Sequence, residues 1–127
     1  MLIGSTRAVR VWAWPAPVDL RLGFDGLFGL VRQRLDKDPL SGDLFLFANR
    51  RRTGCKVLFW DGTGLCLFVK RLERGRFAAL WRAEPHRPVS LTASELALFV
   101  EGSALVGKTA LSPAAIVPKP VAPGSNV

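Results

Sequence analysis

Two strongly apolar runs flank the tetrapeptide DGTG and constrain the fold more than any other feature of the chain. The runs are KVLFW at 56–60 and LCLFV at 65–69. Glycine in so short a connection is typical of a tight β-hairpin. If the turn pairs Trp60 with Leu65, one face carries Leu58, Trp60, Leu65 and Leu67, and the other carries Val57, Phe59, Cys66 and Phe68. Because a sheet with one wet face alternates apolar and polar residues, this sheet needs a cover on both faces.

The same pattern extends the hairpin into an antiparallel meander. Strands are predicted at 43–49, 56–60, 65–72 and 76–80, joined by glycine-containing connections at 50–54, 61–64 and 73–75. The β-rich, alternating segment 9–14 predicts a further strand that Pro15 ends. We expect helices on one face of the sheet. The N-terminal strand, a barrel-like closure or another protein would cover the other.

Two helices are predicted beside the meander. Apolar residues at 24, 27, 28, 31 and 35 share one helical face, and Asp38-Pro39 ends that helix. Thr92 and Glu95 form a capping box at the start of a second helix, which can end at Gly102. The predicted fold class is α+β, an antiparallel β-meander of four to five strands with two helices packed on it.

The chain of 127 residues has the length of one domain. We expect a single α+β domain at 1–103 and a flexible Ala- and Pro-rich tail at 104–127. No apolar run is long enough to cross a bilayer, and Arg7 and Arg10 interrupt any signal-peptide core, which predicts a cytoplasmic protein without a membrane partner. Cys55 and Cys66 lack a CxxC or His-rich setting, which favours buried thiols over a zinc site or a disulfide.

Positive charge is concentrated in the centre of the chain. The net charge is +8, and residues 50–87 carry ten basic and three acidic side chains, or +7 of that total. An excess confined to one segment indicates a polyanionic partner more than general solubility.

Hairpin topology gathers most of these cations at one end of the sheet. Alternate turns of a meander lie at the same end, so the 50–54 and 73–75 turns are expected together, roughly 10 Å apart across two strand spacings. We call this end the basic pole; it comprises Arg50, Arg51, Arg52, Lys56, Lys70, Arg71, Arg74 and Arg76. Only Glu73 opposes these cations there.

Two interpretations of the basic pole remain open. In the first, the arginine stems cover apolar sheet edges while their charged heads are solvated. Alternatively the pole binds the phosphates of a nucleic acid, for which the forked guanidinium is well suited. No helix-turn-helix, zinc-finger, basic-zipper or RNA-recognition signature is present, so contact with the DNA backbone is the prediction. Base stacking is a lesser expectation, for Trp60 and Trp81 before Trp12 and Trp14.

The sequence offers little for catalysis, and we predict no enzyme activity, cofactor or metal. His86 is the single histidine and lies between Pro85 and Arg87 in a predicted loop. A nuclease needs converging carboxylates to hold metal ions, whereas Asp61 and Glu73 are predicted at opposite sheet ends. Walker, Rossmann, nucleophile-elbow and HExxH motifs are absent.

Several ordered motifs give the chain a family resemblance. They are VRVWAW, GFDGLFGLV, DPLSGDLFLF, NRRR, KVLFWDGTGLCLF and KRLERGRF, with LTASELALFVEG as a weaker continuation. Over about 9–77 the chain resembles the TnpB accessory proteins of the insertion-sequence-66 family of bacterial transposable elements. One departure is VDLRLGFDG, where the family usually has a more basic segment like TDMRKGFDG.

The resemblance implies a role in DNA transposition beside a separate transposase that cuts and joins DNA. The resemblance does not identify any catalytic residue in this chain. The leading hypothesis is a non-catalytic accessory protein of insertion-sequence transposition that binds DNA through the basic pole. The alternative is an interaction module that docks on the transposase or forms a homo-oligomer, with no direct DNA contact.

Overall fold

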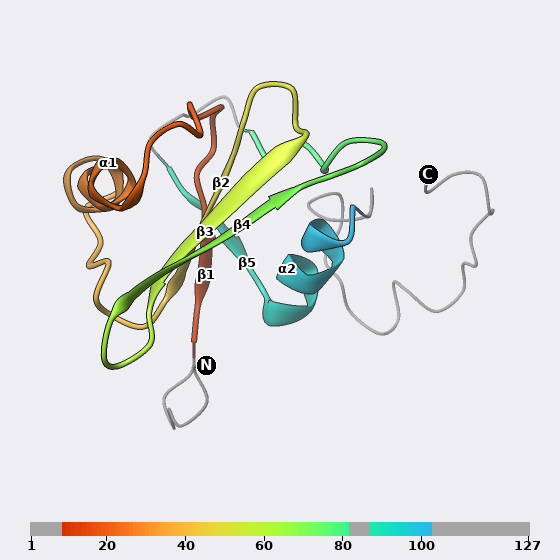
Figure 1. Cartoon of the computed structure of the whole chain (residues 1–127). Helices are drawn as coiled ribbons and strands as arrows, with labels where there is room; N and C mark the ends of the chain where they lie inside the picture. Colours follow the sequence, from red (N-terminus) through yellow and green to blue (C-terminus); the bar gives the residue numbers. More distant parts are fainter. Residues whose placement is uncertain (1–8, 82–86, 103–127) are drawn as a thin grey trace.

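The computed structural model describes residues 9–81 and 87–102 and contains five strands and two helical segments on that part of the chain (Figure 1). In chain order they are β1 (Val11–Ala13), α1 (Phe24–Gly29) with its π-helical continuation η2 (Leu30–Arg34), β2 (Leu44–Ala48), β3 (Gly54–Trp60), β4 (Leu65–Arg71), β5 (Val89–Leu91) and α2 (Ala93–Val100). The predicted α+β class is confirmed.

The strands form one mostly antiparallel sheet in the order β4-β3-β2-β1-β5. β2, β3 and β4 are the predicted antiparallel meander, and Trp60 pairs with Leu65 as expected. β1 pairs with β2 in parallel, so the meander does not extend to the N-terminal strand. The helix at 24–34 makes the crossover between these two parallel strands, which a tight hairpin cannot connect.

Two expectations about the remaining strands are wrong. Residues 76–80 are not a strand: Phe77, Ala78 and Leu80 are buried against the sheet instead of extending it. The fifth strand is β5, inside a region where no strand was expected, and it pairs antiparallel with β1. Phe77-Ala78-Ala79-Leu80 has no apolar–polar alternation, which agrees with its role as a buried loop.

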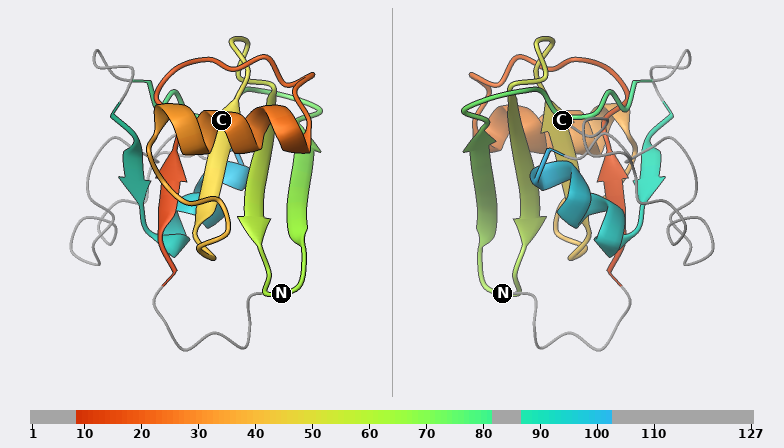
Figure 2. Two further views of the ribbon diagram at one scale, coloured as in Figure 1. Left: turned by 90° about the vertical axis from the view of Figure 1, so that its left-hand side faces the viewer. Right: turned by 90° about the vertical axis from the view of Figure 1, so that its right-hand side faces the viewer.

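A helix covers each face of the sheet, rather than both helices one face (Figure 2). α1 and η2 cover the first face, where Leu27, Val31 and Leu35 pack with Phe45, Phe47 and Leu58 of β2 and β3. Leu65 and Leu67 of β4 join this cluster from the sheet edge. The apolar side chains on this side of the predicted hairpin are therefore explained by the α1 layer.

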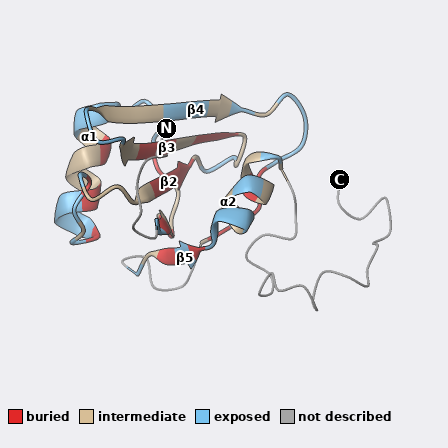
Figure 3. Cartoon of the chain, turned by 90° about the horizontal axis from the view of Figure 1, so that it is seen from below, coloured by how far each residue is buried: buried red, intermediate tan, exposed pale blue. Residues whose placement is uncertain are grey.

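The 77–80 segment and α2 cover the second face. Phe77 stacks on Phe99 of α2 with ring centroids 4.8 Å apart, and both rings are completely buried. Val57 of β3 and Leu46 of β2 belong to the same cluster. Burial is greatest in the central strands and declines toward β4 (Figure 3). The prediction of a sheet covered on both faces is right, but the N-terminal strand lies within the sheet and is not the cover.

Both helices begin and end as the sequence indicates. The helix predicted at 24–35 is present, and its second half becomes π-helical where Leu35 N–H bonds back to the Leu30 carbonyl. At α2, the Thr92 hydroxyl accepts from Glu95 N–H and the Glu95 carboxylate accepts from Thr92 N–H, which confirms the capping box. Gly102 follows α2 with φ of 87°, as a helix-ending glycine commonly does.

Both cysteines are free thiols; Cys55 is buried and Cys66 is half-buried. No helix in the described ranges is long and apolar enough to cross a membrane. The predicted tail at 104–127 and His86 lie outside the described residues. The division into a domain at 1–103 and a tail stays a prediction.

Candidate nucleic-acid interface

The β2–β3 turn and the loop after β4 are bonded directly to each other. Leu72 N–H donates to the Thr53 carbonyl (2.8 Å), and Phe77 N–H donates to the Arg52 carbonyl (2.7 Å). The Arg52 guanidinium returns a bond to the Phe77 carbonyl (3.2 Å). The β3–β4 turn lies at the opposite end of the sheet (Figures 1 and 2). The two basic segments thus form one surface, as the alternation of turns predicts.

Asn49 holds the β2–β3 turn in shape. Its side-chain oxygen accepts from the N–H groups of Thr53 (2.9 Å) and Gly54 (3.1 Å), and its amide nitrogen donates to the Thr53 hydroxyl (3.2 Å). Arg52 follows with φ of 60°, a left-handed conformation uncommon for a residue other than glycine. These bonds fix the backbone that carries the three consecutive arginines.

We predict that Asn49→Ala lowers the free energy of unfolding by about 1–3 kcal/mol, because two partly buried N–H groups lose their acceptor. DNA affinity should fall with it, although no charge is removed. Urea denaturation and DNA titration measure the two effects. Asn49→Asp keeps an acceptor oxygen and serves as the control for the turn. An Asn49→Ala protein as stable as the wild type would contradict this role.

Five of the eight predicted cations are exposed, and within the described ranges they form no hydrogen bond or ion pair through their side chains. They are Arg50, Arg51, Arg71, Arg74 and Arg76. Glu73 lies among them and forms no ion pair with any described residue. These five guanidinium groups are therefore available to an anion.

The other three cations bond to backbone carbonyls. Besides Arg52, Lys56 donates through Nζ to the Leu22 carbonyl (2.9 Å), and Lys70 donates through Nζ to the Val100 carbonyl (2.7 Å). Lys56 thereby secures the approach to α1, and Lys70 places a positive charge at the C-terminus of α2, where the helix dipole favours it. These two lysines lie on opposite faces of the sheet. They support the fold around the basic pole in addition to contributing charge.

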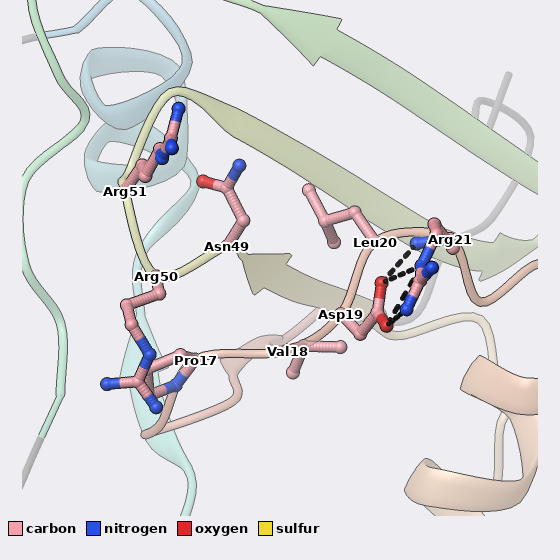
Figure 4. Close-up of a pocket in the computed structure, with 8 residues that line it drawn as sticks. All are labelled: Pro17, Val18, Asp19, Leu20, Arg21, Asn49, Arg50 and Arg51. Atoms are coloured by element: carbon pink, nitrogen blue, oxygen red, sulfur yellow. Dashed lines mark hydrogen bonds and ion pairs between the residues drawn. The ribbon is translucent and has the colours of Figure 1, made fainter.

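Arg21 also lies at this end of the molecule and was not among the predicted cations. It forms a forked ion pair with Asp19 (2.7 Å), and this bonding lowers the pKa of Asp19 to about 2. A cavity of about 650 Å³ lies between this pair and the β2–β3 turn, with Arg50 and Arg51 on its other side (Figure 4). The arginine in VDLRLGFDG was the available signal, but only the fold places it beside the basic pole.

The four tryptophans pack on other parts of the fold or lie at the opposite sheet end. Trp12 donates through Nε1 to Asp43 (3.1 Å) and lies under the Lys37 ammonium, which is 3.8 Å from the ring centroid. Trp14 packs on Phe47. Trp60 ends β3 at the sheet end opposite the basic pole, and Trp81 is half-buried beside Ala13 and Phe99. None of the four rings lies among the exposed arginines.

Three of the aspartates, Asp19, Asp38 and Asp61, accept hydrogen bonds within local turns. Asp61 accepts from the N–H groups of Thr63 and Gly64 in the β3–β4 turn, and these bonds lower its pKa to about 2. Among the described residues, no three His, Cys, Asp or Glu side chains gather as metal ligands. The prediction that the protein has no enzyme activity stays a prediction.

Comparisons with known proteins agree with the resemblance seen in the motifs. The sequence profile of IS66 Orf2-like proteins matches residues 9–109. The uncharacterized protein y4hO of Sinorhizobium fredii is 37% identical over 101 residues, which are 80% of this chain and 86% of that protein. The uncharacterized protein y4jC of the same organism is 41% identical over 76 residues, 60% of this chain and 65% of that protein. No solved structure matches the chain. The chain belongs to the IS66 Orf2-like family and is a transposition-associated accessory protein.

Proposed function

We propose that this accessory protein binds the DNA backbone through the exposed arginines of the basic pole, without catalysing a reaction itself. The observation that carries the proposal is that three hydrogen bonds join two arginine-rich segments, about 20 residues apart in sequence, into one surface. Phosphate is the anion that such a surface fits best, because each guanidinium offers a fork of donors.

The geometry favours backbone contact over base reading. The exposed arginines extend from the β2–β3 turn, the end of β4 and the loop that follows it. No helix among the described elements projects from this end as a recognition helix would. Phosphate contacts fix position and add affinity without selecting a sequence. We therefore expect similar affinity for element-end DNA and random duplex DNA when the protein acts alone.

The transposase of the same element is the proposed protein partner, and it would supply the sequence specificity. A binding assay with and without the transposase separates the two roles. If the accessory protein binds DNA directly, it should bind the duplex without the transposase. A pure interaction module should bind DNA only when the transposase is present.

Salt dependence provides the quantitative test of the interface. Each neutralised phosphate contributes a slope of about −0.9 to the plot of log affinity against log salt concentration, so contacts by all five exposed arginines predict a slope of about −4.5. Fluorescence anisotropy with a labelled duplex at several salt concentrations gives this slope. A slope near zero, or no binding at low salt, would refute phosphate contact by the pole.

A further inference from the structure

β4 leaves a long edge of the sheet open. It is the outermost strand, seven residues long, and no described element pairs with its outer side. The opposite edge strand, β5, has only three residues and follows Pro88. Proteins usually protect such edges with proline, bulges, charged side chains or short strands. β4 has an unbroken register without proline or bulge, and its two charged residues, Lys70 and Arg71, lie at its C-terminal end.

Large apolar side chains are exposed on both faces of this edge. Phe68 is 43% exposed and Val69 is 59% exposed. Phe68 pairs with Val57, which belongs to the α2 side of the core, whereas Val69 pairs with Lys56, which reaches the Leu22 carbonyl near α1. The two side chains therefore flank the sheet edge, one above and one below it.

The backbone groups of β4 that face outward can be identified from the hairpin bonding. Asp61 N–H donates to Gly64, and Leu72 N–H donates to Thr53, so the even-numbered residues of β4 bond inward to β3. Antiparallel pairs alternate between bonded and non-bonded, so the odd-numbered residues direct N–H and C=O away from the sheet. These outward-facing residues are Leu65, Leu67, Val69 and Arg71.

This edge is complementary to itself in one antiparallel register. With Phe68 opposite Phe68 of a second copy, Leu67 faces Val69 and Leu65 faces Arg71. All four outward-facing residues of each copy then find bonded partners, and the two Phe68 side chains meet across the two-fold axis in a close, non-bonded pair.

The charges also fit this register. Each Arg71 lies opposite an apolar Leu65, and the two Arg71 side chains are separated by the length of the strand. Continuing the register past Arg71 sets the acidic 61–64 turn of one copy beside the cationic end of β4 in the other. Like charges are thus kept apart, and Asp61, which is ionised at neutral pH, lies on the cationic side.

We propose that two copies of this chain join edge to edge through β4 to form a continuous ten-stranded sheet, with a two-fold axis at Phe68. The helices α1 of the two copies then lie on the same face, and the two basic poles lie at opposite ends of the dimer. The occupant of the edge is a second copy because the hydrogen-bond pattern, the apolar pair and the charges all match in the same register.

A charge-swap experiment on the full chain tests this arrangement without DNA. Phe68→Glu and Phe68→Lys each place like charges across the two-fold axis, and each should weaken dimerisation at least about tenfold in sedimentation velocity. An equimolar mixture of the two variants should restore the dimer, because Glu and Lys then face each other. Phe24→Glu alters a side chain of similar exposure (46%) on α1 and should leave the dimer intact.

Three results would overturn the proposal. The first is a wild type that stays monomeric at every concentration. The second is dimerisation by both Phe68 variants. The third is a mixture that fails to restore the dimer that each variant has lost. Circular dichroism of each variant should show that the fold is retained, because Phe68 is partly exposed. Self-association is measured without DNA, and the salt-dependence assay measures DNA binding, so each proposal can fail while the other stands.

Discussion

Replacing Arg51, Arg71 and Arg74 together with Glu should abolish DNA binding at low salt. Each replacement removes an exposed guanidinium and adds a carboxylate that repels phosphate, so three favourable contacts become unfavourable. The three side chains make no bonds within the described residues, so the free energy of unfolding should change by less than about 1 kcal/mol. Anisotropy titration and urea denaturation measure these two quantities.

A matched variant separates the basic pole from total charge. Arg10, Arg32 and Arg34 are exposed and lie outside the pole, before β1 and on η2. Changing these three to Glu lowers the net charge from +8 to the same +2, since each replacement changes it by two. Binding should persist in this control. Equal loss of binding in both triple variants would mean that overall charge, and not the pole, attracts DNA.

Phe77→Ala should be the most destabilising single substitution in the loop that follows β4. The ring is fully buried and stacks on Phe99, so its removal leaves a cavity between the sheet and α2. Truncation of a buried phenylalanine lowers the free energy of unfolding by about 3–5 kcal/mol. Urea denaturation gives the change directly.

Ala79 provides the control within the same segment, because its side chain is exposed. Ala79→Ser should change the free energy of unfolding by less than about 0.5 kcal/mol. If Phe77→Ala were equally mild, the segment 77–80 would not be the cover of the second sheet face.

The local signals in the sequence predicted most of the architecture. The DGTG turn and the capping box at Thr92 need only a few adjacent residues, and both occur as predicted. The sequence also predicted that the two basic turns lie at the same end of the sheet, because the end at which a turn lies depends only on the alternation of strand direction. That alternation holds for β2, β3 and β4.

The remaining features depend on contacts between residues distant in sequence. The segment VRVWAW does not predict that β1 lies beside β2 in parallel, because the same alternating strand can pair with a parallel or an antiparallel neighbour. The three-residue β5 is too short to show a period. Likewise, the bonds of Lys56 and Lys70 end on backbone carbonyls more than 25 residues away, for which no side-chain pattern exists.

The strand order has a consequence for synthesis of the protein on the ribosome. β1 is made first, but its second neighbour, β5, is made after every other strand, and Phe99 of α2 follows later still. Until about residue 100 has left the ribosome, one edge of β1 is unpaired and Phe77 lacks its stacking partner. The nascent chain therefore exposes an open strand edge and an apolar sheet face through most of translation, which is the period when such chains are most prone to aggregate.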